Sequence, residues 1–139
     1  MASVFISYSS NDQVKVGRLA ESLRQEKDIK VWLDTTDIYP GDDILEEIKK
    51  GIRAADKIII CLSPSFNKKP PVSWVKKELK MAILRERETG KGVIIPVRIK
   101  SGGQIPEEIG TKAYADISTK NRWKRNLPRL IEAIRRGGV

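Results

Sequence analysis

The feature that most constrains the fold is an unbroken apolar run in the middle of the chain. Residues Ile58–Leu62 read Ile-Ile-Ile-Cys-Leu, without a polar position between them. Because β-branched side chains favour extended backbone, this run predicts a strand. A strand that does not alternate with polar residues is buried on both faces, which is typical of a parallel sheet.

Further strand-like runs recur along the chain, separated by segments with helical spacing. Strands are predicted at residues 3–8, 29–33, 58–62, 92–99 and 112–117, and helices at about 12–25, 44–54, 74–87 and 123–136. This alternation is typical of α/β proteins. We therefore expect a single doubly wound parallel five-stranded sheet of flavodoxin-like order 2-1-3-4-5, with helices on both faces. The length of the chain predicts one domain, over residues 1–139.

Some elements carry signals of their own. The first helix is inferred from apolar positions at helical spacing, namely Val14, Val16, Leu19, Ala20 and Leu23. Pro96 indicates that one side of the fourth strand is not fully paired. Pro128 falls early in the last helix, so that helix is expected to start nearer Asn126. The third strand is expected to end at Ser63-Pro64-Ser65, and a polar, proline-bearing loop is expected to follow, up to a helix that begins near Ser73 and Trp74.

The composition excludes several kinds of site. The chain has no histidine, which rules out His-based triads and His metal sites, and we expect no metal centre and no cofactor. Cys61 is the single cysteine and lies inside the apolar run, as a core residue in a reducing compartment would. No run approaches the roughly 18 apolar residues of a membrane helix, and no signal peptide precedes the first strand. We expect a cytoplasmic protein without membrane contact.

The charge is strongly basic, with 27 Lys and Arg against 18 Asp and Glu and a net charge of +9. Such a balance can serve nucleic acid, an anionic small ligand or solubility. No zinc-finger spacing, RNA-binding aromatic motif or Gly-rich phosphate loop accompanies it, so direct nucleic-acid binding is not expected. The basic positions between Arg122 and Arg136 are interpreted as a solvated helix face.

Hydroxyl side chains follow the two strands that flank the switch point of a 2-1-3-4-5 sheet. Ser7, Tyr8 and Ser9 end the first strand, and Ser63 and Ser65 follow the third. Open α/β sheets bind ligands at this place, so the hydroxyls are candidates for ribose or phosphate contacts. They are equally suited to capping helices and turns.

A tryptophan and a carboxylate follow shortly afterwards. Trp74 and Glu78 are four residues apart, so on a helix they lie on one face. Trp74 is either the wall of a pocket or a side chain that seals the start of its helix. Glu78 is either a reactive carboxylate or an exposed partner for a neighbouring lysine. If the chain has a reactive group, the placement favours Glu78.

Taken in order, these residues resemble a known family. Phe5-Ile-Ser-Tyr-Ser9 with Asp12 is similar to the first box of a Toll/interleukin-1 receptor (TIR) domain. Val31-Trp-Leu-Asp34 and Asp37-Ile-Tyr-Pro-Gly-Asp42 resemble its second box and its BB loop. Leu62-Ser-Pro-Ser-Phe66 and Ser73-Trp-x-x-x-Glu78-Leu79 resemble the region around the glutamate of NAD⁺-consuming members. The boxes stand in the family's order and spacing over nearly the whole chain.

The resemblance implies an enzyme that cleaves NAD⁺, its substrate, to nicotinamide and ADP-ribose or a cyclic ADP-ribose. Glu78 would be the catalytic residue. Substrate contacts are implied for Ser7, Tyr8, Ser9, Ser10, Asp34, Ser63, Ser65 and Trp74. An NAD⁺-cleaving animal member of the family has two arginines where this chain has Ser9-Ser10, so the substrate contacts there must differ. The Tyr-Ser-Ser sequence of this chain is closer to bacterial members.

Assembly is also implied by the resemblance. The BB loop, with Asp37, Ile38, Tyr39, Pro40, Gly41 and Asp42, would cover the substrate and contact neighbouring TIR domains. Activity would then depend on self-association, in a protein of innate immunity or anti-phage defence that can carry a sensor or oligomerisation domain. The alternative is a scaffold without catalysis that signals through TIR–TIR contacts. A third reading is a nucleoside-processing relative of the deoxyribosyltransferases.

Overall fold

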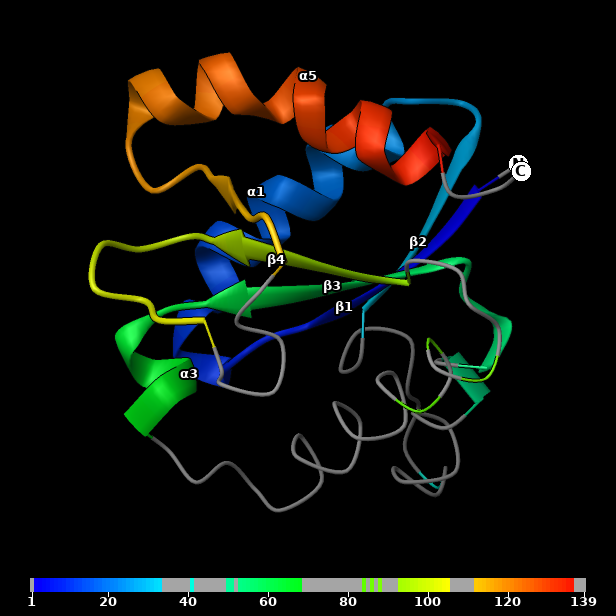
Figure 1. The fold of residues 1–139 in the computed structure, drawn as a ribbon, viewed down its shortest axis with the longest axis horizontal. Coiled ribbons are helices and arrows are strands. Elements are labelled where there is room, and N and C mark those ends of the chain that lie inside the picture. Colours follow the sequence, from blue (N-terminus) through cyan, green and yellow to red (C-terminus); the bar gives the residue numbers. More distant parts are fainter. Residues whose placement is uncertain are drawn as a thin grey trace.

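The computed structural model describes residues 2–33, 41, 50–51, 53–68, 84, 86, 88, 93–105 and 112–136, with backbone alone at Ser10 and Lys68. It contains a five-stranded sheet of order β2-β1-β3-β4-β5, in which every pairing is parallel (Figure 1). The strands are β1 (Ala2–Ser7), β2 (Ile29–Leu33), β3 (Lys57–Leu62), β4 (Ile94–Arg98) and β5 (Ala115–Asp116). The predicted class and strand order are confirmed.

The centre of the sheet is β3, as its composition predicts. All six of its residues are buried, and it pairs with β1 on one side and β4 on the other. The outer strand β2 alternates instead, with Lys30 exposed between buried neighbours. At β4, Pro96 pairs with β3, whereas the register with β5 covers only Val97 and Arg98. One side of β4 is therefore incompletely paired at the proline, which confirms that prediction.

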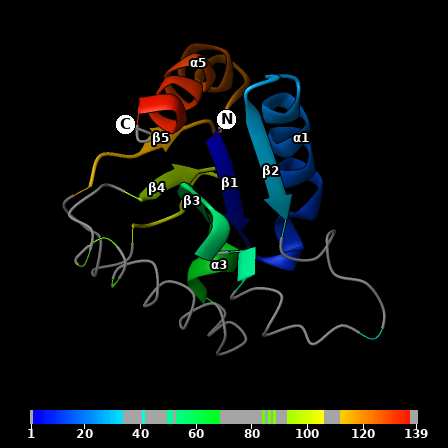
Figure 2. The same cartoon turned by 90° about the vertical axis from the view of Figure 1, so that its right-hand side faces the viewer.

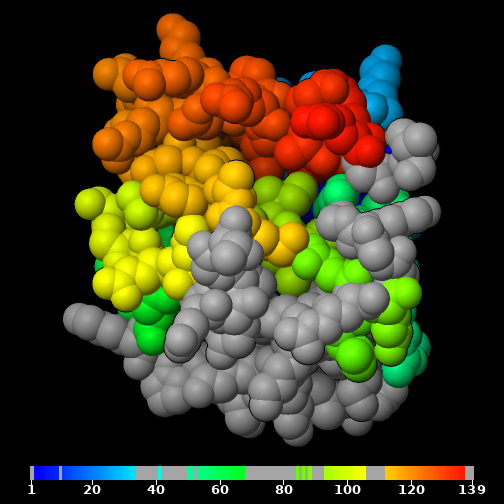
Figure 3. All heavy atoms as spheres, viewed as in Figure 1, coloured from blue at the N-terminus to red at the C-terminus, as the bar shows by residue number. Residues whose placement is uncertain are grey.

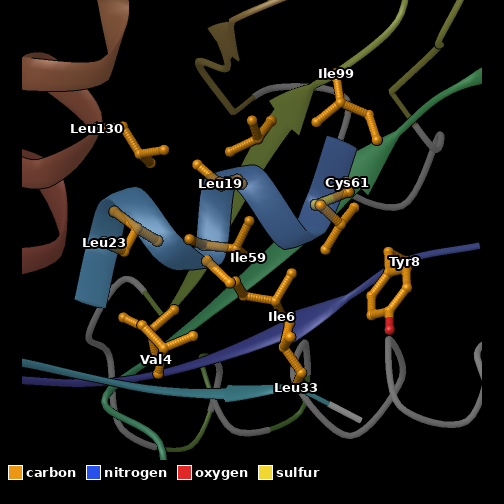
Figure 4. Packing of buried hydrophobic residues seen from close by; sticks show 14 of the residues in the cluster. Val4, Ile6, Tyr8, Leu19, Leu23, Leu33, Ile59, Cys61, Ile99 and Leu130 are labelled. Carbon is orange, nitrogen blue, oxygen red and sulfur yellow. The ribbon is translucent and has the colours of Figure 1, made fainter. Parts of the chain in front are cut away.

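Two long helices cover one face of the sheet (Figures 1 and 2). They are α1 (Gln13–Arg24), preceded by the 3-10 turn η1 (Ser10–Asp12), and α5 (Lys120–Arg136). Figure 4 shows Leu19 and Leu23 of α1 and Leu130 of α5 meeting Ile6 and Ile59 of the strands, and the same side chains belong to one buried apolar cluster. Cys61 lies within that cluster and is fully buried, as expected.

The opposite face of the sheet is buried as well. Phe5, Ile58, Ile60 and Leu62 form its core, and Phe66 of the short helix α3 (Pro64–Lys68) packs against them. The helices expected at residues 44–54 and 74–87 lie largely outside the described residues. Their described members, at positions 50, 51, 53 and 54 and at 84 and 86, are helical, and so is position 88 just beyond the second range. Helices on both faces are therefore supported.

Two boundary predictions are wrong. The segment after β3 is the helix α3 and not a loop, because Ser63 caps it and Pro64 fits the first turn. The last helix starts at Lys120 and not near Asn126. By contrast, the first helix, predicted at about 12–25, agrees with α1, although Val14 is 82% exposed and the buried stripe starts at Val16.

The early start of α5 has a visible cause. The Thr119 hydroxyl accepts a hydrogen bond from the Arg122 N–H at 3.2 Å, and its carbonyl accepts one from Trp123. Because of this N-cap the helix starts at Lys120, eight residues before Pro128. Pro128 is exposed, so water can satisfy the carbonyl that lacks a helical N–H partner. Among the described residues, no helix is long and apolar enough to cross a membrane.

Candidate active site at the carboxyl ends of the strands

The carboxyl ends of three parallel strands lie at one edge of the sheet. The connections that follow β1, β3 and β4 meet there, at the left of Figure 1 where the arrowheads of β3 and β4 point. They comprise residues 8–12, the start of α3 and residues 99–105. Part of the last connection is the yellow surface at the left of Figure 3. This edge is where open α/β sheets bind ligands.

A buried carboxylate joins the three connections. The Asp12 side chain has no exposed surface, and its Oδ2 accepts a hydrogen bond from the Ser63 hydroxyl at 2.5 Å. Lys100 Nζ lies 2.8 Å from Oδ1 in an ion pair, and Oδ1 accepts no hydrogen bond from the described residues. The Lys100 side chain is 45% exposed, so the pair links the interior with the surface. Asp12 precedes α1 but makes no side-chain cap there.

The hydrogen bonds of Ser63 explain how α3 begins. Its hydroxyl donates to Asp12 and accepts the Phe66 N–H at 3.0 Å, while its carbonyl accepts the Asn67 N–H at 3.0 Å. Ser63 is therefore the N-cap of α3 and is completely buried. Its described contacts fit capping, which is one of the two roles that the sequence allowed. A substrate contact for Ser63 stays a prediction.

The connection after β4 packs tightly on the end of β3. The Gly103 N–H donates to the Lys100 carbonyl at 3.2 Å, and Gly102 has a φ of +89°, which favours glycine. A Cβ at Gly103 would lie 2.6 Å from the Leu62 carbonyl oxygen. The Asn67 side chain also bonds the Gln104 backbone twice, donating at 2.9 Å and accepting at 2.7 Å. These contacts fix α3 against residues 100–104.

The hydroxyls predicted after β1 are brought close to those after β3. Ser7 and Tyr8 are buried, and in Figure 4 the Tyr8 hydroxyl points away from the apolar cluster. The Ser9 hydroxyl accepts from the Asn11 N–H at 3.4 Å, and the Asn11 side chain lies 3.5 Å from the Ser65 hydroxyl. Asn11 thus spans the two strand ends. The structure supports the predicted meeting of these side chains, while their contact with a substrate stays a prediction.

The other predicted site residues lie outside the described residues. They are Ser10 (side chain), Asp34, Asp37, Ile38, Tyr39, Pro40, Asp42, Trp74 and Glu78. Gly41 is described, lies in a turn and has a φ of +95°. This positive φ is typical of a glycine in a turn and agrees with the loop that the resemblance implies there. The roles implied for these residues remain predictions.

Positive charge gathers beside the buried carboxylate. Lys15 donates to the Ser118 carbonyl at 3.1 Å. Burial lowers the pKa of Lys15, and the nearby charges of Lys100 and Arg18 lower it further. On the β5 side, burial opposes ionisation of Asp116, but hydrogen bonds from Ser118 and the Arg122 and Arg98 charges hold its pKa below the ordinary value. The edge can therefore attract an anionic ligand.

The structure adds site residues that the sequence did not predict. Lys100, Asn67 and Gln104 had no assigned role, and Asp12 was noted only within a motif. Asp12 follows a polar run typical of an N-cap. The local sequence therefore predicts that Asp12 caps a helix and gives no sign of its contact with Ser63. A Gly-Gly pair after a strand does indicate a close approach of backbone, so Gly103 is the one member that its sequence context could have identified.

A parallel sheet of this order defines a flavodoxin-like domain, and its polar cluster at the ends of β1 and β3 lies where such domains generally bind ligands. The TIR domain family model matches residues 4–131. The chain belongs to the TIR domain family.

Two curated relatives are named as enzymes, one as a cyclic ADP-D-ribose synthase and one as an NAD(+) hydrolase. The chain is 37% identical over 94 residues to the 2' cyclic ADP-D-ribose synthase BtTIR of Bacteroides thetaiotaomicron, covering 67% of this chain and 31% of that protein. It is 36% identical over 95 residues to the NAD(+) hydrolase TcpA of a Theionarchaea archaeon (strain DG-70-1), covering 68% of this chain and 27% of that protein. The matched regions are thus less than a third of the length of either relative.

Solved structures share the fold. The TIR domain of the Toll-related receptor TRR-2 from Hydra magnipapillata has a TM-score of 0.76 and 23% identity, over 95% of this chain and 97% of that one. A prokaryotic SEFIR domain has a TM-score of 0.70 and 18% identity, over 96% and 99% of the two chains. At these identities the likeness concerns the fold.

Proposed function

We propose that this domain cleaves the nicotinamide–ribose bond of NAD⁺ and releases nicotinamide with ADP-ribose or a cyclic ADP-ribose. The observation that carries the proposal is the pair of relatives, about a third identical in sequence, that are named for these two outcomes. The proposal takes residues 1–139 as one cytoplasmic domain. A sensor or oligomerisation domain elsewhere in the native protein would be consistent with the greater length of the relatives.

The chemistry needs few catalytic groups. Nicotinamide in NAD⁺ is a cationic pyridinium, so it leaves as a neutral molecule when it takes the electron pair of the C–N bond. No general acid is required, in contrast to glycosidases that use two carboxylates. One carboxylate, Glu78, would accept hydrogen bonds from the ribose hydroxyls and stabilise the oxocarbenium-like charge. Attack by water, with loss of a proton, gives ADP-ribose, and attack by a hydroxyl of the same molecule gives a cyclic product.

Glu78 must stay ionised in this role. The neighbouring charges of Lys76 and Lys77 would favour the carboxylate, and so would the first half of the helix that the sequence predicts at about 74–87. Trp74, one helical turn earlier, would wall the nicotinamide–ribose pocket. The described positive charge at Lys15 and Lys100 supports an anionic substrate at this edge.

The test is nicotinamide release from NAD⁺ by the parent and by Glu78→Gln, which keeps the shape and removes the charge. Protein concentration should be high and a crowding agent present, so that self-association is favoured. We expect turnover in the parent and a loss on the order of 100-fold or more in the variant. Glu88→Gln is the matched control, because it makes the same substitution at an exposed glutamate.

Each outcome separates the possible functions. Turnover that survives Glu78→Gln would contradict the role of Glu78 while keeping the enzyme. No turnover in the parent, under conditions in which oligomers form, would favour the scaffold that signals through TIR–TIR contacts of the BB loop. Cleavage of nucleosides without turnover of NAD⁺ would favour the deoxyribosyltransferase-like alternative.

A further inference from the structure

We propose that Asp12 is a positioning residue, which with Ser63 and Lys100 holds the carboxyl ends of β1, β3 and β4 in the geometry that the reaction needs. These three residues are called the carboxyl-end clamp. The inference rests on the proposed function, because it concerns the same edge of the sheet. It adds to that function a set of residues that act on the site without touching the substrate.

The first argument is the burial of charge. A carboxylate without exposed surface is unfavourable unless charge and hydrogen bonds compensate it. Asp12 has both, through Lys100 at 2.8 Å and the Ser63 hydroxyl at 2.5 Å. Each partner comes from a different connection, so the carboxylate is satisfied only when all three connections are in place. The clamp therefore selects one relative arrangement of the strand ends.

The second argument is the double use of the Ser63 hydroxyl. It donates to Asp12 and in the same geometry accepts the N–H that begins α3. Asp12 thereby fixes the rotation of the hydroxyl that caps the helix. A second link, between Asn67 and the Gln104 backbone, ties the same helix to the connection that carries Lys100. The start of α3 is held from two sides.

The third argument is the position of α3 in the chain. The described part of α3 runs to Lys68, and the sequence continues from there to Trp74 and Glu78. The Asn11 side chain also reaches Ser65 across the same edge. A displacement of α3 would therefore shift a wall of the proposed site, and misplacement by about 1 Å can reduce a rate by about 100-fold.

The test uses four variants of the complete chain: two that break the clamp, one that should rescue it and one control. Asp12→Asn keeps the shape and an acceptor for Ser63 but breaks the ion pair, and Lys100→Met removes the other partner. Lys100→Arg is the conservative variant that should rescue the loss. Asp56→Asn is the control at the opposite end of the sheet, where the exposed Asp56 carboxylate, just before β3, accepts hydrogen bonds from the N–H and the hydroxyl of Ser3 in β1.

Two readouts distinguish positioning from stability alone. The kcat and KM of nicotinamide release are measured per folded molecule, well below each Tm, and hydrogen exchange follows the amides of Phe66 and Gln104. We expect Asp12→Asn and Lys100→Met to lower kcat by tenfold or more, with KM changed less than about threefold. Exchange at the two amides should accelerate. Lys100→Arg should restore most of the kcat, and Asp56→Asn should lower the Tm without changing kcat.

The failure of each idea is recognisable. A parent that turns over NAD⁺, with an unchanged kcat in Asp12→Asn, would overturn the positioning role and leave the proposed function standing. A parent without turnover would overturn both. Unchanged exchange at Phe66 and Gln104 in Asp12→Asn and in Lys100→Met would overturn the clamp itself, whatever the activity. If Asp12→Asn does not fold, Lys100→Met and its arginine rescue decide.

Discussion

Glu86 stabilises the amino end of β4, and its side chain makes several strong contacts there. One carboxylate oxygen, Oε2, accepts the N–H groups of Val93 and Ile94, both at 2.7 Å, and pairs with Lys112 at 2.9 Å. Burial alone would raise the pKa of Glu86, but these hydrogen bonds and the Lys112 charge lower it overall. Burial also lowers the pKa of Lys57 beside it. The carboxylate ties a helical segment to the sheet.

This arrangement predicts a pH-dependent contribution to stability. Because the pKa of Glu86 is below 4.5 in the folded protein, its contribution is complete above about pH 4.5 and is lost as the pH falls through the folded value. Glu86→Gln should lower the free energy of unfolding by about 1–3 kcal/mol at neutral pH. The difference from the parent should shrink in more acid solution.

Urea unfolding of the parent and the variant at several pH values between neutral and acid tests this. Glu88→Gln serves as the control, since Glu88 is exposed and should give no difference at any pH. A difference for Glu86→Gln that stays constant down to the acid limit would show that the charge of Glu86 is not what stabilises the contact.

At the scale of elements, the turn after β4 depends on a glycine. A Cβ at Gly103 would lie 2.6 Å from the Leu62 oxygen and 2.8 Å from the Ser63 nitrogen, and backbone atoms cannot move aside as a flexible side chain can. Gly103→Ala should therefore lower the free energy of unfolding by about 1–3 kcal/mol. Differential scanning calorimetry would show a lower Tm.

Gly17 provides the matched substitution. It lies in α1, where a Cβ meets nothing within 4 Å, and alanine favours a helix by about 0.5–1 kcal/mol over glycine. Gly17→Ala should thus raise the Tm slightly. Equal changes in the two alanine variants would argue against a close approach at Gly103.

Elements with local signals were predictable from the sequence. The uniform apolar run of β3 and the alternation in β2 reveal their burial, because each side chain reports its own face. The Ser-Pro start of α3 is also a local signal, yet its proline favoured the interpretation of a loop. The start of α5 depends on the Thr119 cap, which competes with the helix-breaking signal of Pro128.

The candidate site was only partly predictable, because its contacts are long-range. The strand order alone predicts that the hydroxyls after β1 and β3 lie close together. The hydrogen bond between Asp12 and Ser63 joins residues 51 positions apart. It depends on side-chain directions that no local sequence pattern encodes. Lys100 is an ordinary surface lysine in sequence terms, and only the fold brings it to a buried carboxylate.

For the whole molecule, the net charge of +9 on 139 residues opposes association between copies. Added salt shortens the range of this repulsion to about 10 Å at 0.1 M. We therefore expect self-association to increase between about 0.01 and 0.15 M salt, together with turnover per chain at saturating NAD⁺. Sedimentation velocity and nicotinamide release on the same samples test this.

The control for this prediction is dilution at constant salt. Turnover per chain should fall on dilution if assembly activates the domain. Turnover that is independent of both salt and concentration would contradict activation by self-association, although it would leave the catalytic proposal intact.

The position of β1 also affects how the chain can be made. As the first strand to be synthesised, β1 lies inside the sheet, between β2 and β3. Val4, Phe5 and Ile6 are completely buried in the finished domain. While the chain emerges from the ribosome, one edge of this apolar strand has no partner until residues 57–62 arrive. During that interval the nascent chain presents an unpaired hydrophobic strand, the kind of surface that chaperones bind and that aggregation begins from.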